Sequence, residues 1–278
     1  MIQITQANEA GLDERQRREQ DYHRTYAASH VAKANEAVAL DVIQPGPRRP
    51  WNGYWVTYDL LIAEQLAGKR VLIPGCGFGE DAIRLAKLDA HVFASDLSPE
   101  LLAVTRQRAR NMGVLTAEFS VMPAESLSYP DNFFDVVYFN DILHHVDIPR
   151  AVAEAKRVLK PGGVVIANEL YTHSRMQRMR TSPIVSGLLY KHMVGFIYGT
   201  ETPYITEDEH KIDEHELTIL EAALRPGIWR KNFLFLGGRL LPKDWLPVAR
   251  FDQAVFALTG AMGNMLAGRV VLRGVIAK

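Results

Sequence analysis

Hydrophobic positions follow two different periods between Lys69 and Asn168, and the two periods alternate along the chain. Short, mostly apolar runs predict strands at 70–73, 90–95, 117–121, 134–139 and 164–168. The segments between several of them have helical spacing and predict helices at 81–88, 99–112 and 148–159. Strands that alternate with helices are typical of right-handed βαβ units, and therefore of a mainly parallel sheet covered on both faces.

The flanking segments extend this pattern. Residues 8–40 predict a largely helical segment that ends before the Pro45-Gly46-Pro47 cluster, and the stretch 14–35 within it lacks Gly and Pro. Four aromatic residues at positions 51, 54, 55 and 58 have helical spacing, and we expect their rings to share one face that packs on the core. Apolar runs at 233–236 and 270–276 predict two last strands with a helix between them. We therefore expect an α/β fold with a Rossmann-like, mainly parallel seven-stranded sheet.

Charge and cysteine content narrow the function classes. The chain has 278 residues, and 32 basic side chains balance 32 acidic ones, so it lacks the basic field that a bulk nucleic-acid binder needs. The single cysteine, Cys76, can form neither an internal disulfide nor a thiolate zinc cage. The longest apolar tract, near 254–266, is too short and too interrupted for a membrane span. We expect a cytoplasmic protein that crosses no membrane and contains no metal.

A glycine-rich turn lies between the first strand and the helix that follows. Gly75, Gly77 and Gly79 let the backbone approach a ligand closely, and the helix N-terminus offers unpaired N–H groups. Asp96 ends the next strand, 21 residues after Gly75, where a carboxylate can accept both ribose hydroxyls. Together they predict an adenine nucleoside site. A dinucleotide-binding G-x-G-x-x-G motif that starts at Gly75 would have its third glycine at position 80, where this sequence has Glu80. A nicotinamide cofactor is therefore the least favoured ligand.

The order of these motifs resembles a known family. The stretch 71–79, Asp96, residues 124–125, the run 134–137, the His144-His145 pair and the stretch 157–163 have the order and spacing of class I S-adenosylmethionine-dependent methyltransferases. The similarity is to the branch with quinone C-methyltransferases and natural-product small-molecule O- and N-methyltransferases, and it covers roughly residues 50–170. It implies S-adenosylmethionine as the cofactor.

The resemblance also implies roles for particular residues. The glycines would line the methionine and ribose parts of the donor, and Cys76 between them would pack as a small apolar residue. Asp96 would bind the ribose, Leu97 would flank the adenine, and Asn140 would lie near the methionine moiety. The cofactor-binding set is Gly75, Cys76, Gly77, Gly79, Asp96, Leu97, Ala124, Glu125 and Asn140. Ala124 and Glu125 would frame the adenine, although Pro123 stands where the family often has Asp.

We expect the chain to consist of four parts. Residues 1–50 would form an N-terminal helical extension or lid, and 51–170 the S-adenosylmethionine-binding core. Residues 171–230 are too long for a simple connection and would form a helical insertion that shapes the acceptor site. Residues 231–278 would add the last strands of the sheet.

Methyl transfer to a hydroxyl needs a general base. Glu169 ends the fifth strand and His145 follows the fourth, so we expect these two side chains to form an acid–base pair, although His144 could face the site instead. The substrate-binding candidates are Tyr22 and Tyr26 on the N-terminal helix, Tyr171 and His173 after Glu169, and Tyr198 and Tyr204 in the insertion.

The favoured hypothesis is thus methyl transfer to a hydroxyl or nitrogen of a small-molecule acceptor. C-methylation of a quinone-like ring is the alternative within the enzyme class, and a non-catalytic nucleoside-binding interaction module is the alternative outside it. We expect no nucleic-acid partner and consider a homo-oligomer possible.

Overall fold

The computed structural model describes residues 11–180, 182–183, 211–224, 227–237, 240–242 and 245–278. Two of the predicted substrate residues, Tyr198 and Tyr204, lie outside the described residues. No helix in these ranges is both long and apolar enough to cross a lipid bilayer.

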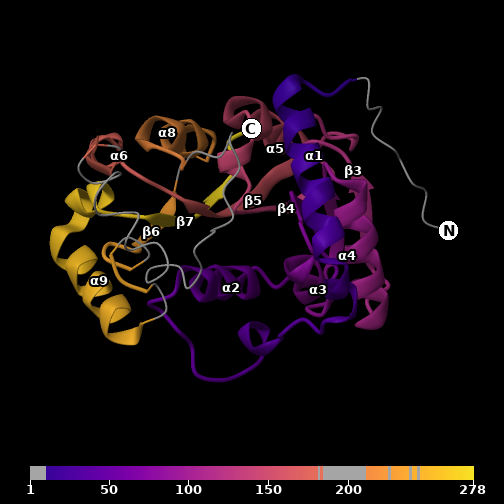
Figure 1. Cartoon of the computed structure of the whole chain (residues 1–278), viewed down its shortest axis with the longest axis horizontal. Helices are drawn as coiled ribbons and strands as arrows, with labels where there is room; N and C mark the ends of the chain where they lie inside the picture. The colour runs from indigo at the N-terminus through magenta and orange to yellow at the C-terminus, as the bar shows by residue number, and fades with distance from the viewer. Residues whose placement is uncertain (1–10, 181, 184–210, 225–226, 238–239, 243–244) are drawn as a thin grey trace.

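A seven-stranded sheet forms the centre of the molecule, and the predicted fold class is confirmed (Figure 1). Its strand order is β3-β2-β1-β4-β5-β7-β6. The strands are β1 (Arg70–Pro74), β2 (His91–Asp96), β3 (Ala117–Val121), β4 (Phe134–Asn140), β5 (Leu159–Leu170), β6 (Trp229–Phe233) and β7 (Arg269–Val275). The first five are parallel, and β7 runs antiparallel to both of its neighbours. The order reverses between β1 and β4, where open α/β sheets bind ligands.

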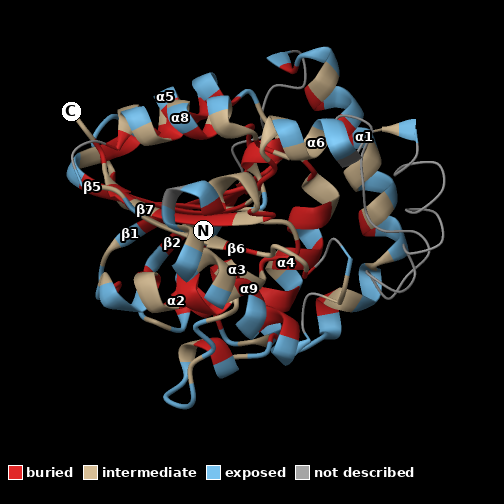
Figure 2. Cartoon of the chain, turned by 90° about the vertical axis from the view of Figure 1, so that its left-hand side faces the viewer, coloured by how far each residue is buried: buried red, intermediate tan, exposed pale blue. Residues whose placement is uncertain are grey.

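Helices cover both faces of the sheet. They are α1 (Glu14–Ser29), α2 (Gly53–Ala63), α3 (Glu80–Ala86), α4 (Pro99–Asn111), α5 (Ile148–Val158), α6 (Ser174–Arg180), α8 (Glu214–Ala223) and α9 (Leu246–Thr259). In Figure 1, α2 and α3 lie below the sheet, whereas α5 and α8 lie above it. The buried strands between these layers are red in Figure 2. Val71 and Ile73 belong to the core on the α2 and α3 side, while Leu72 belongs to the core beneath α5 and α8, as the period of a strand requires.

The prediction of a strand at 233–236 was wrong, because β6 covers Trp229–Phe233 instead. Leu234 has a φ of +62°, which ends the extended conformation immediately after Phe233. The next three backbone N–H groups, those of residues 235–237, all donate to the buried carboxylate of Asp252 on α9. The apolar run therefore wraps around a carboxylate and does not continue the ladder.

Three smaller predictions also need correction. The N-terminal helix ends at Ser29, short of the predicted residue 40, and a 3₁₀ helix (Val31–Asn35) follows it. β5 begins at Leu159 and not at 164, so its ladder extends across the Gly162-Gly163 turn. The four aromatic rings at 51–58 do not share one face, because Trp51 precedes α2 and lies against Arg250, whose guanidinium carbon is 5.6 Å from the ring.

Candidate active site

The glycine-rich turn follows β1 and combines two structural requirements. Gly79 has a φ of +76°, and a Cβ there would lie 2.3 Å from Cγ2 of Thr105, so packing against α4 excludes any side chain. Gly77 has a φ of +51°, but a Cβ there would meet nothing within 4 Å. Gly79 therefore packs too closely against α4 for any side chain, whereas the space beside Gly77 is open to a ligand.

Asp96 ends β2 beside this turn and holds it in place. Its Oδ2 accepts the Gly77 N–H at 2.9 Å, and its Oδ1 accepts the N–H of Ser98, the N-cap residue of α4, at 3.0 Å. A carboxylate has about four lone-pair sites, so each oxygen can still accept a further donor such as a hydroxyl. Asp96 thus both caps the loop before α4 and presents acceptors where the sequence predicts a ribose.

Cys76 lies within the turn but has no chemical role in this geometry. Its backbone N–H donates to Ser95 O at 2.9 Å, and its side chain packs against the core on the α2 and α3 side. Burial raises the pKa of the Cys76 thiol well above its usual range, so the sulfur stays protonated.

The first turn of α3 contains a half-buried carboxylate, Asp81, which is not among the predicted site residues. Its Oδ1 accepts the hydroxyls of Tyr58 at 2.5 Å and Tyr54 at 2.7 Å, and its Oδ2 accepts Nδ2 of Asn140 at 2.9 Å. Burial raises the pKa of Asp81, although the tyrosine hydroxyls and nearby Arg84 oppose the shift. The spacing of Tyr54 and Tyr58, one helical turn apart on α2, was the available signal for this site.

Asn140 continues the polar network across the ends of three strands. Its Oδ1 accepts Nδ2 of Asn168 at 2.8 Å, and Oδ1 of Asn168 accepts Nη1 of Arg269 at 3.0 Å. Arg269 in turn pairs with Asp141 at 2.9 Å. Side chains from β4, β5 and β7 thus form one hydrogen-bonded row at the carboxyl edge of the parallel strands.

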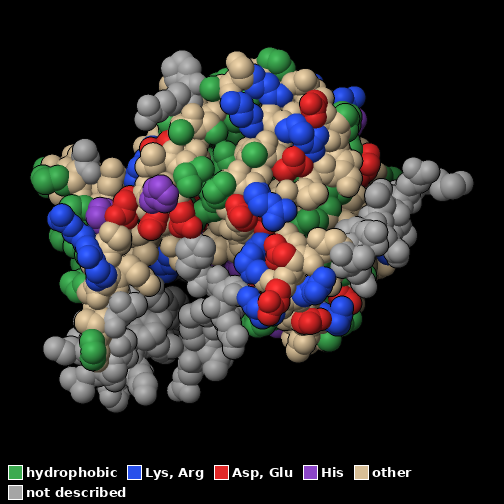
Figure 3. Space-filling model, turned by 90° about the horizontal axis from the view of Figure 1, so that it is seen from above, with side chains coloured by type: hydrophobic (Ala, Val, Ile, Leu, Met, Phe, Trp, Pro, Cys, Tyr) green, Lys and Arg blue, Asp and Glu red, His purple; other side chains and the backbone are tan. Residues whose placement is uncertain are grey.

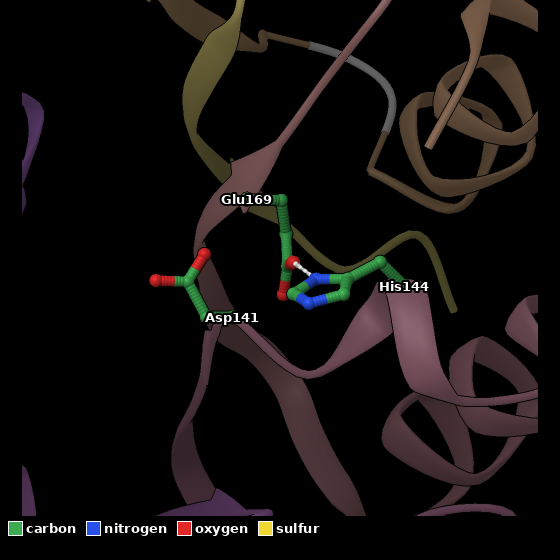
Figure 4. Close-up of side chains that lie close together, drawn as sticks. All are labelled: Asp141, His144 and Glu169. Carbon is green, nitrogen blue, oxygen red and sulfur yellow. Dashed lines mark hydrogen bonds and ion pairs between the residues drawn. The ribbon is translucent and has the colours of Figure 1, made fainter. Parts of the chain in front are cut away.

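Glu169 pairs with His144, so the predicted pair of His145 with Glu169 was wrong. Glu169 Oε2 lies 3.0 Å from Nδ1 of His144, and both side chains are buried (Figure 4). Its other oxygen accepts the N–H groups of Ile142 at 3.0 Å and Leu143 at 2.9 Å. The 3₁₀ turn Leu143–His145 directs the two histidines differently, which strand periodicity alone could not predict.

His145 faces the N-terminal helix. Its Nδ1 lies 3.4 Å from Oε1 of Glu19, and Nε2 of His23 lies 3.5 Å from the other oxygen of Glu19. Burial lowers the pKa of His23, but the hydrogen bond that its imidazole donates to Glu19 and the charges of Asp96 and Glu19 outweigh it, so the pKa is raised. His145 therefore belongs to the contact with α1 and not to the pair at the end of β5.

Helix α1 packs over the nucleoside end of the site, alongside α4. Gln20 Nε2 donates to Leu97 O at 2.9 Å, and the Tyr26 ring centroid is 5.6 Å from that of Phe78 in the glycine-rich turn. Tyr22 lies next to Tyr26 on the same helix, with ring centroids 6.3 Å apart. The helix therefore contacts both the loop that follows β2 and the turn that follows β1.

Glu125 has a structural partner on the same helix. Its Oε1 accepts the Arg15 guanidinium, which also donates to His145 O, and the N–H of Asp147 at 3.1 Å. Ala124 and Glu125 are both buried between the ends of β3 and α5. Glu125 thus connects α1 to the sheet in this conformation.

Asp141, His144 and Glu169 bring three potential metal-ligating atoms within 4.8 Å of one another (Figure 4). Their lone pairs have other partners, however. Arg269 forms two contacts with Asp141, at 2.9 and 3.1 Å, and the two oxygens of Glu169 accept three donors between them. The arrangement fits an oriented imidazole better than a cation site.

Tyr171 and His173 line a pocket of about 520 Å³ beyond the end of β5. Tyr171 is buried and forms a β-bridge with Ile212 just before α8.

Comparison with known proteins agrees with this geometry. Residues 72–167 match the family described as a methyltransferase domain. A ubiquinone biosynthesis O-methyltransferase of Xanthomonas oryzae is 34% identical over 154 residues, 54% of this chain and 62% of that protein. A ubiquinone/menaquinone biosynthesis C-methyltransferase of Vibrio cholerae is 29% identical over 158 residues, 55% of this chain and 59% of that protein. The chain therefore spans less than two thirds of the length of these relatives.

Among solved structures, the [4+2]-cyclase SpnF superposes with a TM-score of 0.56 at 21% identity, covering 99% of this chain and 98% of that one. The chain thus contains a methyltransferase domain at residues 72–167, and its fold is similar to that of SpnF. Because the same fold also serves a cyclase, the fold alone does not define the reaction.

Proposed function

We propose that the protein transfers a methyl group from S-adenosylmethionine to a hydroxyl or nitrogen of a small molecule. The observation that carries this proposal is a pair of carboxylates near the β1/β4 switch point, together with a turn that is open at Gly77. The carboxylates are Asp96, which accepts the Gly77 N–H, and Asp81 at the start of α3. S-adenosylmethionine has ribose hydroxyls for one carboxylate and an ammonium group for the other.

S-adenosylmethionine supplies an electrophilic methyl group on a sulfonium centre. Asp96 would accept the ribose hydroxyls, and Asp81, oriented by Tyr54, Tyr58 and Asn140, would accept the ammonium of the methionine tail. Leu97 would flank the adenine ring, and helix α1 would exclude water above it through the Gln20 contact. Methyl transfer is an in-line displacement, so positioning of this kind supplies much of the rate.

We propose His144 as the general base. Ionised Glu169 can only accept hydrogen bonds, so its contact with Nδ1 of His144 fixes the proton on that nitrogen. Nε2 is then the nitrogen that can take a proton from an acceptor hydroxyl. The two backbone N–H donors to Glu169 hold the carboxylate in place while the imidazole becomes charged.

C-methylation of a quinone-like ring is the second candidate, and the Vibrio cholerae relative favours it. An activated ring carbon also needs removal of a proton, so the same His144 and Glu169 would serve. A binding module without catalysis would keep the donor contacts but would not need the oriented imidazole. In each case the partner would be a small molecule and not a nucleic acid, with the chain acting in the cytoplasm, alone or as a homo-oligomer.

The test is transfer of radiolabelled methyl groups from S-adenosylmethionine to a panel of phenols, sugar hydroxyls, amines and hydroquinones. The proposal predicts label in at least one oxygen or nitrogen acceptor, and loss of that label in Glu169→Gln. Label on ring carbon alone would support the second candidate. Donor binding without transfer to any acceptor would support the binding module instead.

A further inference from the structure

A pocket of about 520 Å³ lies between α8, β6 and the 3₁₀ helix Gly260–Met265. Its apolar wall includes Leu217 and Met265, and its polar wall includes Tyr171, Glu221 and Arg230. Tyr171 follows Glu169 by only two residues in the chain, so this pocket opens next to the end of β5 that contributes to the proposed catalytic pair. None of the residues proposed to bind S-adenosylmethionine lines this pocket.

Arg230 is the unusual feature of the pocket. Its Nη1 donates to Glu221 Oε1 at 3.0 Å and its Nε donates to Asn232 Oδ1 at 3.4 Å. Its Nη2 is buried and forms no hydrogen bond of good geometry in the described part of the chain, although the Tyr171 hydroxyl interacts with the same guanidinium. The guanidinium carbon is 5.7 Å from the centroid of the Tyr171 ring, so the group lies beside the wall of the pocket nearest β5. A buried donor without an acceptor is costly and calls for a partner.

The charges around the pocket determine which partner is suitable. Glu221 already neutralises Arg230. Burial acts to raise the pKa of Glu214, but hydrogen bonds from the Ser174 N–H at 2.8 Å and Ser174 Oγ at 2.5 Å lower it to about 2, so Glu214 is ionised. Two carboxylates therefore face one guanidinium.

His173 lies beside Glu214 in the wall of the pocket. Its Nδ1 accepts the N–H of Arg175 at 3.2 Å and lies 3.7 Å from Oε1 of Glu214. Figure 3 shows acidic side chains grouped around a histidine on the side of the molecule where α8 lies, whereas acidic and basic side chains alternate on the α1 side. Helix α8 itself contains Glu214, Glu216 and Glu221 without a lysine or arginine. An anionic ligand would be repelled here.

We propose that this pocket holds the non-reacting end of the methyl acceptor, and that this end is uncharged, largely apolar and carries a carbonyl or hydroxyl oxygen that accepts Nη2 of Arg230. The inference rests on the proposed function for its link to the acceptor. The apolar body of the ligand would pack between Leu217 and Met265, and Tyr171 would form the boundary with the methyl-transfer site. Arg230 is thus a specificity-determining residue.

The experiment compares the binding of two probes of similar size, one neutral and one anionic. Saturation-transfer NMR with the full chain and no donor measures binding of 4-hydroxyacetophenone, a neutral ketone, and of 4-hydroxybenzoate, its anionic counterpart. We expect the ketone to bind at least about tenfold more tightly than the benzoate. Equal or tighter binding of the benzoate would overturn the proposal, as would a failure of both probes to bind.

Variants connect the binding to Arg230. Arg230→Lys keeps the positive charge opposite Glu221 but removes the planar guanidinium. We expect this variant to bind the ketone at least about fivefold more weakly. The matched control is Lys231→Gln, since this neighbour on β6 donates to Pro50 O on the other side of the sheet. Unchanged ketone binding in Arg230→Lys would contradict the assignment.

A third variant separates this inference from the proposed function. Asp96→Ala should leave ketone binding unchanged, because Asp96 lies in the donor site. If the wild type binds the ketone but not the donor, the methyltransferase proposal fails while the pocket assignment holds. If it binds the donor but not the ketone, the reverse applies.

Discussion

Oε2 of Glu169 lies 3.0 Å from Nδ1 of His144, and this contact decides which imidazole nitrogen can act as a base. Because the other oxygen of Glu169 accepts two backbone N–H groups, the carboxylate cannot turn away from the imidazole. In the proposed mechanism, the proton of the neutral imidazole lies on Nδ1 and the basic lone pair on Nε2. Glu169 lies on β5, and His144 lies in the 3₁₀ turn that follows the neighbouring parallel strand β4.

Glu169→Gln should reverse this tautomer. A glutamine can still accept the backbone N–H groups through its oxygen, but its amide then donates to Nδ1, which moves the imidazole proton to Nε2. We expect kcat to fall by about 10²–10⁴-fold with little change in KM, and the remaining rate to rise with pH as hydroxide replaces the base. Steady-state kinetics between pH 6 and 9 measure both effects.

His145→Gln is the matched control for that experiment, since His145 neighbours His144 but faces Glu19. Its kcat should stay within a few-fold of the wild type, by the same kinetic criterion. A loss as large as that of Glu169→Gln, with an unchanged pH profile in both variants, would mean that the histidines only stabilise the 3₁₀ turn.

The variants Gly77→Ala and Gly79→Ala distinguish an effect on ligand binding from an effect on folding stability. Both positions have positive φ, so each alanine costs about 1–2 kcal/mol of backbone strain. Only the alanine at position 79 also clashes, with Thr105, so Gly79→Ala should be the less stable by more than about 1 kcal/mol in urea unfolding. Gly77→Ala should remain folded but bind S-adenosylhomocysteine weakly, because its Cβ would fill ligand space. Equal stability of the two variants would contradict this division.

Asp81→Asn tests the proposed ammonium site. The substitution keeps the shape and the oxygen that the tyrosines contact, but removes the negative charge. We expect S-adenosylhomocysteine to bind about 10- to 100-fold more weakly, because a charged hydrogen bond is lost. Methylthioadenosine has no amino-acid tail, so its affinity should not change. Calorimetry with both ligands is the measurement, and equal weakening of the two would argue against an ammonium contact.

His23 should make the packing of α1 depend on pH. Its raised pKa means that the folded state holds the proton more tightly than the unfolded chain. The resulting stabilisation is fully present below the unfolded value of 6.5 and is lost as the pH rises through the higher folded value. Urea midpoints of the wild type should therefore fall across this window.

The reference protein for that measurement is His23→Gln, in which the fall across the same window should be smaller. An equal fall in both proteins would show that other groups cause it. Glu19→Gln should act in the same direction as His23→Gln, because it removes the acceptor beside His23.

The sheet and the position of Asp96 beside the glycine-rich turn could be predicted from the sequence because they depend on local signals. Apolar periods predicted the five parallel strands, and Gly77 and Asp96 lie close together because β1 and β2 end side by side. The position of β6 could not be predicted, since it depends on Asp252, which lies on α9 and binds three backbone N–H groups far away in the sequence.

The proposed catalytic pair and the proposed methionine end of the site were harder to predict, because they also depend on contacts between separate elements. Which histidine meets Glu169 depends on the 3₁₀ turn Leu143–His145, whose course strand periodicity does not give. Asp81 gains its role only when Tyr54 and Tyr58 from α2 meet Asn140 from β4 around it. Such convergence of separate elements leaves little trace in local periodicity.

The central claim, that the β1/β4 switch point binds S-adenosylmethionine, is tested most directly by calorimetric titration of the full chain with S-adenosylhomocysteine. We predict 1:1 binding in the micromolar range for the wild type, weakened at least about 100-fold in Asp96→Ala because two charged hydrogen bonds to the ribose are lost. No binding by the wild type, or equal binding by wild type and Asp96→Ala, would contradict the account.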